Sequence, residues 1–210
     1  MRAARGERAS RTARDGGTRQ RAIGAALTGF GTRGYEATSL DALAAELGVR
    51  KQTILYHFAS KEALLDAVID EAGRELVSVF EDALSRAGEG WSRVDAVVRS
   101  VFRLAGRRPE LLGLLREVSR LGPPAATRFS AALGPFIDRA TGFLEDGMDS
   151  GYLRRQDARL LLIATYSMVI GVATEVEVLR ALGVEPTARV LVRQRAALLE
   201  FLRSALAPAG

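Results

Sequence analysis

Residues 38–61 read TSLDALAAELGVRKQTILYHFASK, and this stretch predicts how the N-terminal part of the chain folds. From Leu40 onward, apolar residues recur at i, i+3, i+4 and i+7, which predicts a helix of about eight residues. Gly48 follows as a turn residue, because glycine tolerates a positive φ. A second short helix is predicted at residues 50–58. Two short helices joined by a tight turn form a helix-turn-helix, which suits the major groove of DNA.

The second of these helices has two distinct faces. Ile54 and Phe58 lie one turn apart and are predicted to face inward, whereas Gln52 and Tyr56, also one turn apart, are predicted to face away. A helix this short is not stable alone. Neighbouring helices must therefore hold it, as they hold a recognition helix.

Positive charge is concentrated in the same part of the chain. Among 30 basic residues only two are lysines, Lys51 and Lys61, and both lie in the quoted stretch. Residues 1–61 hold eleven of the 30 basic residues and five of the 25 acidic ones, which gives +6 there and −1 in the remainder. A basic N-terminal third is typical of a nucleic-acid-binding protein with a separate second function. A solvated basic tail explains the composition alone equally well.

The start of the chain lacks apolar periodicity. Residues 1–17 are predicted to form a disordered basic arm, which either reaches phosphates and the minor groove or has no defined role. A helix is predicted from Thr18 to about Gly31–Gly34. Residues 29–34 match G-x-G-x-x-G, but a dinucleotide site needs a preceding strand. No strand is predicted there, so the glycines are interpreted as a helix stop and turn.

Several classes of protein are disfavoured by the composition. The chain has no cysteine and a single histidine, His57, which disfavours disulfides, thiolate chemistry and metal clusters. The N-terminus has no apolar signal segment. The longest uncharged apolar run, residues 160–174, is shorter than the ~20 residues that a membrane-spanning helix needs. A soluble cytoplasmic protein without cofactor or metal is expected.

The predicted fold class is all-α. An N-terminal three-helix helix-turn-helix domain, residues 18–67, is joined to a C-terminal helical bundle, residues 68–210, and Ser60 is a suitable N-cap for the helix that connects them. That helix is predicted to reach about Ala87, and no strand is predicted. The further helices are predicted at Trp91–Arg107, Pro109–Leu121, Pro124–Asp149, Asp157–Leu182 and Thr187–Leu206, with breaks at glycine and proline.

Residues 18–67 resemble the DNA-binding domain of the TetR/AcrR family of bacterial transcriptional repressors, over about a quarter of the chain. The matching marks are Phe30-x3-Gly34-Tyr35-x2-Thr38-Ser39, Leu43-Ala44-x2-Leu47-Gly48-Val49, Thr53-Ile54 with Phe58, and Ser60-Lys61-Glu62-x-Leu64. Two positions depart from the family. Leu55 stands where a tyrosine is usual, and Gln52 stands where a small residue is frequent. The resemblance implies a C-terminal bundle that binds a small effector and dimerises through its last two long helices.

Ten residues are predicted to contact DNA: Thr38, Ser39, Arg50, Lys51, Gln52, Thr53, Leu55, Tyr56, His57 and Lys61. Those at helix starts lie where backbone N–H groups already favour a phosphate. Arg or Lys suits guanine, Gln suits adenine, and a Thr methyl group suits thymine. Tyr56 and His57 are expected to reach phosphates or thymine methyl groups. Capping or local packing is the alternative for several of these positions.

Eight residues are candidates for the lining of an effector pocket: Phe102, Arg103, Leu114, Glu117, Phe129, Phe136, Phe143 and Tyr166. Pockets between bundle helices are mostly apolar with a few polar anchors, so an apolar or amphiphilic ligand is expected. Ordinary core packing is the alternative for each aromatic residue.

Three hypotheses follow for the function. The first is a homodimeric, ligand-responsive repressor that reads a palindromic operator and is released by a population shift. The second is an enzyme within an all-α bundle, which the lack of cysteine and the single histidine disfavour. The third is an interaction module that dimerises without DNA or ligand, which leaves the charge asymmetry unexplained.

Overall fold

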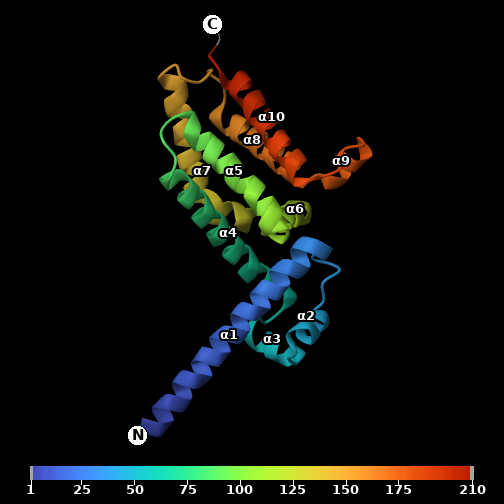
Figure 1. Cartoon of the computed structure of the whole chain (residues 1–210). Coiled ribbons are helices and arrows are strands. Elements are labelled where there is room, and N and C mark those ends of the chain that lie inside the picture. The colour runs from blue at the N-terminus through green and yellow to red at the C-terminus, as the bar shows by residue number, and fades with distance from the viewer. Residues whose placement is uncertain (1, 209–210) are drawn as a thin grey trace.

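A computed structural model describes the backbone of residues 2–208 and the side chains of residues 17–176 and 178–208. These residues form ten helices and no strand, so the all-α prediction is confirmed (Figure 1). The helices are α1 (Arg2–Arg33), α2 (Leu40–Leu47), α3 (Lys51–His57), α4 (Lys61–Ser85), α5 (Trp91–Arg107), α6 (Pro109–Leu121), α7 (Ala125–Asp149), α8 (Ala158–Thr174), α9 (Val176–Ala181) and α10 (Ala188–Leu206). None of these helices combines the length and apolar character that a bilayer crossing needs.

Local signals place the ends of the short helices. The Ser39 side chain accepts a hydrogen bond from the backbone of Ala42 and caps α2, which ends at Gly48 with φ of 66°. Ser60 caps α4 in the same way, because its hydroxyl accepts from the Ala63 N–H at 3.1 Å. Such caps satisfy N–H groups that the helix itself leaves without partners. They explain why α2 and α4 begin close to the predicted residues.

Helix α4 joins the N-terminal unit (residues 18–67) to the helical body (residues 68–210). The predicted boundary between the two falls inside α4, which is continuous from Lys61 to Ser85. One cluster of buried apolar side chains runs from Ala22 in α1 to Leu202 in α10 and therefore includes both parts. The two-domain division stays a prediction, because the described structure has a shared core rather than a linker.

Two close helix pairs hold α1 and the shared helix α4 against the other helices of the body. Helices α4 and α7 approach closely at Gly73, where an added Cβ would lie 2.6 Å from the Ala132 Cβ. Helices α1 and α6 touch backbone to backbone, since a Cβ on Gly31 would overlap the Glu110 carbonyl oxygen and one on Gly113 would overlap the Gly31 carbonyl oxygen. These pairings make the junction rigid by close packing.

Residues 2–17 begin α1 in the structure, whereas the sequence pattern predicts a disordered arm there. Arginine and alanine both have high helix propensity, so missing apolar periodicity removes a packing face without removing the helix. Figure 1 shows this end of α1 extending beyond the other helices. The side chains of residues 1–16 lie outside the described residues, so their contact with DNA stays a prediction.

The single helix predicted at Asp157–Leu182 is in fact two helices, α8 and α9. The break lies at Glu175, whose ψ of 60° is not helical. The Glu175 carboxylate lies 3.0 Å from the Arg116 guanidinium of α6. The apolar run ends at this charged residue, and the chain turns outward there as the projecting α9 (Figure 1).

Candidate nucleic-acid interface

Helix α3 is held on its inner side and open on its outer side. Ile54 and Phe58 are buried in the core of the N-terminal unit, as their spacing predicts. Gln52 is exposed, and Tyr56 is 75% exposed. Figure 1 shows α2 and α3 at the end of the molecule away from α8 and α10. The outer face of α3 therefore presents a glutamine and a tyrosine, one turn apart, to a partner.

The start of α3 adds positive charge to this face. Arg50 is exposed and precedes the helix. The Lys51 ammonium lies 2.8 Å from the Asp41 carboxylate of α2, across the turn between the two helices. Exposed ion pairs contribute little to stability, so this pair costs little to open toward a phosphate.

Lys61 lies at the start of α4 on top of an aromatic ring. Its ammonium is 4.1 Å from the centroid of the Tyr35 ring. The Tyr35 hydroxyl donates to the Glu62 carboxylate at 3.1 Å. Burial, followed by this hydrogen bond, raises the pKa of Tyr35 to about 12. The phenol therefore stays a donor at neutral pH, and the ring supports Lys61 at a helix N-terminus, where an anion is favoured.

Thr38 requires a correction to the predicted set of DNA contacts. Its side chain is 0% exposed, and its hydroxyl donates to the Gly34 carbonyl oxygen at 2.9 Å. Its methyl group packs against Gly29, where an added Cβ would lie 2.7 Å away. The side chain of Thr38 therefore holds the turn before α2 and is closed off from DNA.

The remaining predicted contacts differ in exposure. Ser39 is exposed but its hydroxyl caps α2. Thr53, Leu55 and His57 are half-buried, and Leu55 packs against the core. Helix α3 is so short that the flanks of its outer face also meet the neighbouring helices. The structure thus brings the predicted residues together around α3, with Arg50, Gln52 and Tyr56 the most open.

Three residues near the start of the N-terminal unit, which the sequence pattern does not single out, hold the helices around α3. The Arg21 guanidinium donates to the Leu47 carbonyl oxygen at the end of α2, at 2.8 Å. The Arg19 guanidinium lies 5.3 Å from the centroid of the Phe58 ring, at the end of α3. Gln20 donates to the Glu71 carboxylate of α4 at 3.1 Å. These side chains tie α1 to the other three helices, and the sequence shows only that two of them are charged and one is polar.

The eight effector candidates lie in several different surroundings. Phe102, Leu114 and Phe129 share the main core, whereas Phe136 stacks on Phe80 with ring centroids 4.6 Å apart. The others lie apart: Phe143 packs against the second apolar cluster, Glu117 binds the backbone of Tyr35, and Arg103 and Tyr166 are exposed. Core packing explains most of the aromatic residues in this set.

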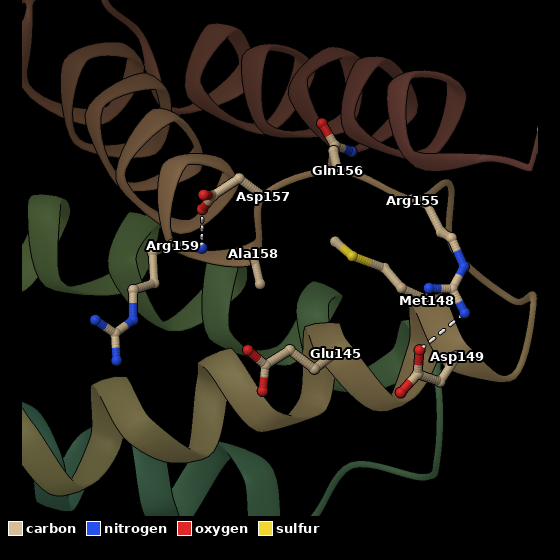
Figure 2. Close-up of a pocket in the computed structure, with 8 residues that line it drawn as sticks. All are labelled: Glu145, Met148, Asp149, Arg155, Gln156, Asp157, Ala158 and Arg159. Atoms are coloured by element: carbon tan, nitrogen blue, oxygen red, sulfur yellow. Dashed lines mark hydrogen bonds and ion pairs between the residues drawn. The ribbon is translucent and has the colours of Figure 1, made fainter.

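Two open depressions lie elsewhere on the body. One, of about 470 Å³, lies where α7 ends and α8 begins (Figure 2). Its charged groups partly neutralise one another, since Arg155 lies 3.0 Å from Asp149. The other, of about 590 Å³, lies between α5 and α10 beside Trp91, whose ring carries the Arg203 guanidinium. None of the eight effector candidates lines either depression.

Comparisons with known proteins identify the N-terminal unit. A family model of bacterial regulatory proteins, tetR family, matches residues 22–68. The chain is 25% identical over 167 residues to the HTH-type transcriptional regulator UidR of Escherichia coli K12, covering 75% of this chain and 83% of UidR.

Solved structures resemble the whole chain. One is a transcriptional regulator from Saccharomonospora viridis in complex with choline, with a TM-score of 0.75 and 20% identity over 92% of this chain and 100% of that one. Another is the transcriptional regulator FadR from Bacillus subtilis in complex with stearoyl-CoA, with a TM-score of 0.69 and 21% identity over 89% of this chain and 98% of that one. At these identities the likeness concerns the fold.

Proposed function

The chain belongs to the TetR family of bacterial transcriptional regulators, and from this premise we propose that it is a homodimeric repressor of a palindromic operator. Helix α3 of each protomer enters the major groove, and Lys61 contacts a phosphate. A small apolar or amphiphilic effector shifts the dimer to a geometry in which the two α3 helices no longer match the operator.

The exposed face of α3 carries this proposal. Tyr56 is a large side chain that is 75% exposed, and it lies one turn from the exposed Gln52. Neither side chain belongs to the apolar core of the chain. A tyrosine and a glutamine at this spacing suit base edges and thymine methyl groups, and the N-terminal charge of +6 supplies attraction to phosphates.

Footprinting of the DNA upstream of the chain's own gene tests the operator. We expect one protected palindromic segment whose half-sites are centred about one helical turn apart, roughly 34–36 Å. Protection is expected to weaken steeply as salt rises from about 50 to 200 mM, because phosphate contacts release counterions. If no segment is protected in preference to its neighbours at low salt, the operator proposal fails.

The proposed dimer is supported by the outer faces of α8 and α10, which pack side by side (Figure 1). Leu160 and Ile163 are exposed on α8, and Val192 and Phe201 are exposed on α10. Apolar side chains that gather on neighbouring helices indicate an interface. Isologous pairing of these helices would cover the same patch on both protomers.

Ile163→Glu is expected to dissociate the dimer. Ile163 is 61% exposed in the single chain, and a carboxylate buried there would lose its hydration without gaining a partner. We expect the dimer dissociation constant to rise by about a hundredfold or more, as measured by analytical ultracentrifugation. Tyr56→Glu introduces the same charge at another large exposed side chain, on α3, and is the matched control, which should remain dimeric. A fully dimeric Ile163→Glu protein would contradict this placement of the interface.

A further inference from the structure

Glu117 is a buried carboxylate that the DNA-binding face does not contain. It lies on α6 in the helical body and is 9% exposed. One of its oxygens accepts a hydrogen bond from the backbone N–H of Tyr35 at 2.6 Å. Arg120 donates to both of its oxygens at 2.8 Å. The sequence placed Glu117 among effector contacts, but its carboxylate is used by the N-terminal unit.

The charge of Glu117 is maintained by these partners. The hydrogen bonds from Arg120 are the largest cause, and with the N–H of Tyr35 they hold the pKa of Glu117 below its ordinary value despite burial. A charged acceptor makes a hydrogen bond of this kind stronger than one between neutral groups. The Glu117–Tyr35 bond is therefore a firm attachment at neutral pH.

The attachment lies on the turn between α1 and α2. Gly34 has a φ of 91°, and a Cβ on it would lie 3.4 Å from a carboxylate oxygen of Glu117. The carboxylate thus packs directly over the Gly34–Tyr35 peptide. A movement of this part of α6 would displace that peptide, because α1 and α6 are in backbone contact at Gly31 and Gly113.

Tyr35 also contacts the first two residues of α4, Lys61 and Glu62. Its ring lies 5.2 Å from the Phe30 ring on one side, and the Lys61 ammonium lies 4.1 Å from its centroid. Its hydroxyl donates to Glu62, the residue that follows Lys61. The position of Lys61 therefore depends on where Tyr35 is held.

We propose that Glu117 is a positioning residue for DNA binding, which holds Tyr35 so that its ring places Lys61 against an operator phosphate. The inference rests on the proposed function, and it adds a route by which the body controls one phosphate contact. A displacement of α6 reaches Lys61 through two contacts, the Glu117–Tyr35 hydrogen bond and the Tyr35–Lys61 ring contact. Glu117 itself touches no DNA.

A double-mutant cycle between Glu117 and Lys61 tests this route. Operator affinity is measured by fluorescence anisotropy at fixed salt for the wild type, Glu117→Ala, Lys61→Ala and the double variant. Contacts in one network are non-additive, so we expect Glu117→Ala to weaken binding about fivefold to tenfold in the wild type but less than about twofold in the Lys61→Ala background. Glu117→Gln keeps an acceptor for the Tyr35 N–H and is expected to restore most of the affinity.

Glu110→Ala is the matched control. Glu110 also lies on α6 beside α1 and is also ion-paired, with Arg108, but it makes no contact with Tyr35. Its removal is expected to change affinity by less than about twofold in either background. If the alanine variant of Glu117 does not fold, Glu117→Leu, which fills a similar volume, takes its place in the cycle.

The outcomes separate this inference from the proposed function. Equal fold losses from Glu117→Ala in both backgrounds would overturn the route through Lys61, as would unchanged affinity of the single variant. In either case the wild type would still bind its operator, and Lys61→Ala would still lower the operator affinity. Absence of selective binding by the wild type would instead overturn the proposed function.

Discussion

Gly31→Ala is expected to destabilise the folded chain by about 3 kcal/mol, at the upper end of the range for overpacking a close-packed site. The added Cβ would overlap the carbonyl oxygen of Glu110 in α6. That atom belongs to the backbone, so it has no rotamer into which it can withdraw. Helices α1 and α6 must separate, and the separation removes apolar contacts around Leu111 and Leu112. The midpoint of urea unfolding measures the loss.

Gly24→Ala provides the matched control for this prediction. Gly24 lies in the same helix, two turns earlier, and an added Cβ there meets nothing within 4 Å. Alanine has the higher helix propensity, so this substitution is expected to stabilise the chain by up to about 1 kcal/mol. Equal unfolding midpoints for the two variants would mean that α1 and α6 do not meet as closely as the structure describes.

The double substitution Lys61→Ala and Tyr56→Ala is expected to weaken operator binding by about a hundredfold at fixed salt. Tyr56 is a 75% exposed side chain of α3, and Lys61 is the lysine at the N-terminus of α4. Loss of one phosphate-binding cation is also expected to reduce the slope of log K against log salt by about one. Fluorescence anisotropy across a salt series measures both quantities.

Arg74→Ala controls for charge alone. Arg74 lies on α4, as Lys61 does, but it is paired with Glu71, and the two side chains are 2.6 Å apart. Its removal changes the net charge by the same amount as Lys61→Ala. We expect an affinity within about twofold of the wild type, because an exposed paired charge away from the contact contributes little. If Arg74→Ala lowered operator affinity as much as the double variant does, the effect of Lys61 would be explained by net charge alone and not by a specific contact.

Much of the fold follows from short-range signals. The inward face of α3 at Ile54 and Phe58 was predicted because helical spacing places residues four apart on one side. The start of α4 was predicted because Ser60 is a good N-cap. Both signals act over a few residues of sequence, and the structure confirms both. The sequence does not indicate the extra break at Glu175, because no glycine or proline interrupts the chain between Glu175 and Leu182.

The junction could not be predicted, because its partners are distant in sequence. Glu117 and Tyr35 are 82 positions apart, and no spacing rule links an α6 carboxylate to a backbone N–H in a turn. The helix end predicted near Gly31–Gly34 is confirmed, since α1 ends at Arg33, but nothing in the sequence indicates that Gly31 also allows α6 to approach. Thr38 was assigned to DNA because it precedes a helix, yet packing against Gly29 buries it. In each case a tertiary contact decides between two roles that look alike in sequence.

The residues that line an effector pocket could not be predicted from the sequence pattern either. An aromatic residue inside a bundle has the same pattern whether it fills the core or lines a pocket. The three residues Phe102, Leu114 and Phe129 share the core cluster, while Arg103 is exposed. An effector bound among these three residues would have to open space between packed side chains, and pattern alone does not indicate where a core opens.

We propose that the surface formed by α3 and the start of α4 reads a DNA sequence. The most direct measurement titrates the wild type and the Lys61→Ala, Tyr56→Ala double variant against the footprinted operator and a scrambled duplex at the same salt. From this proposal we expect the wild type to prefer the operator by about a thousandfold and the double variant to lose most of this preference. A double variant that binds the operator as tightly and as selectively as the wild type would contradict it.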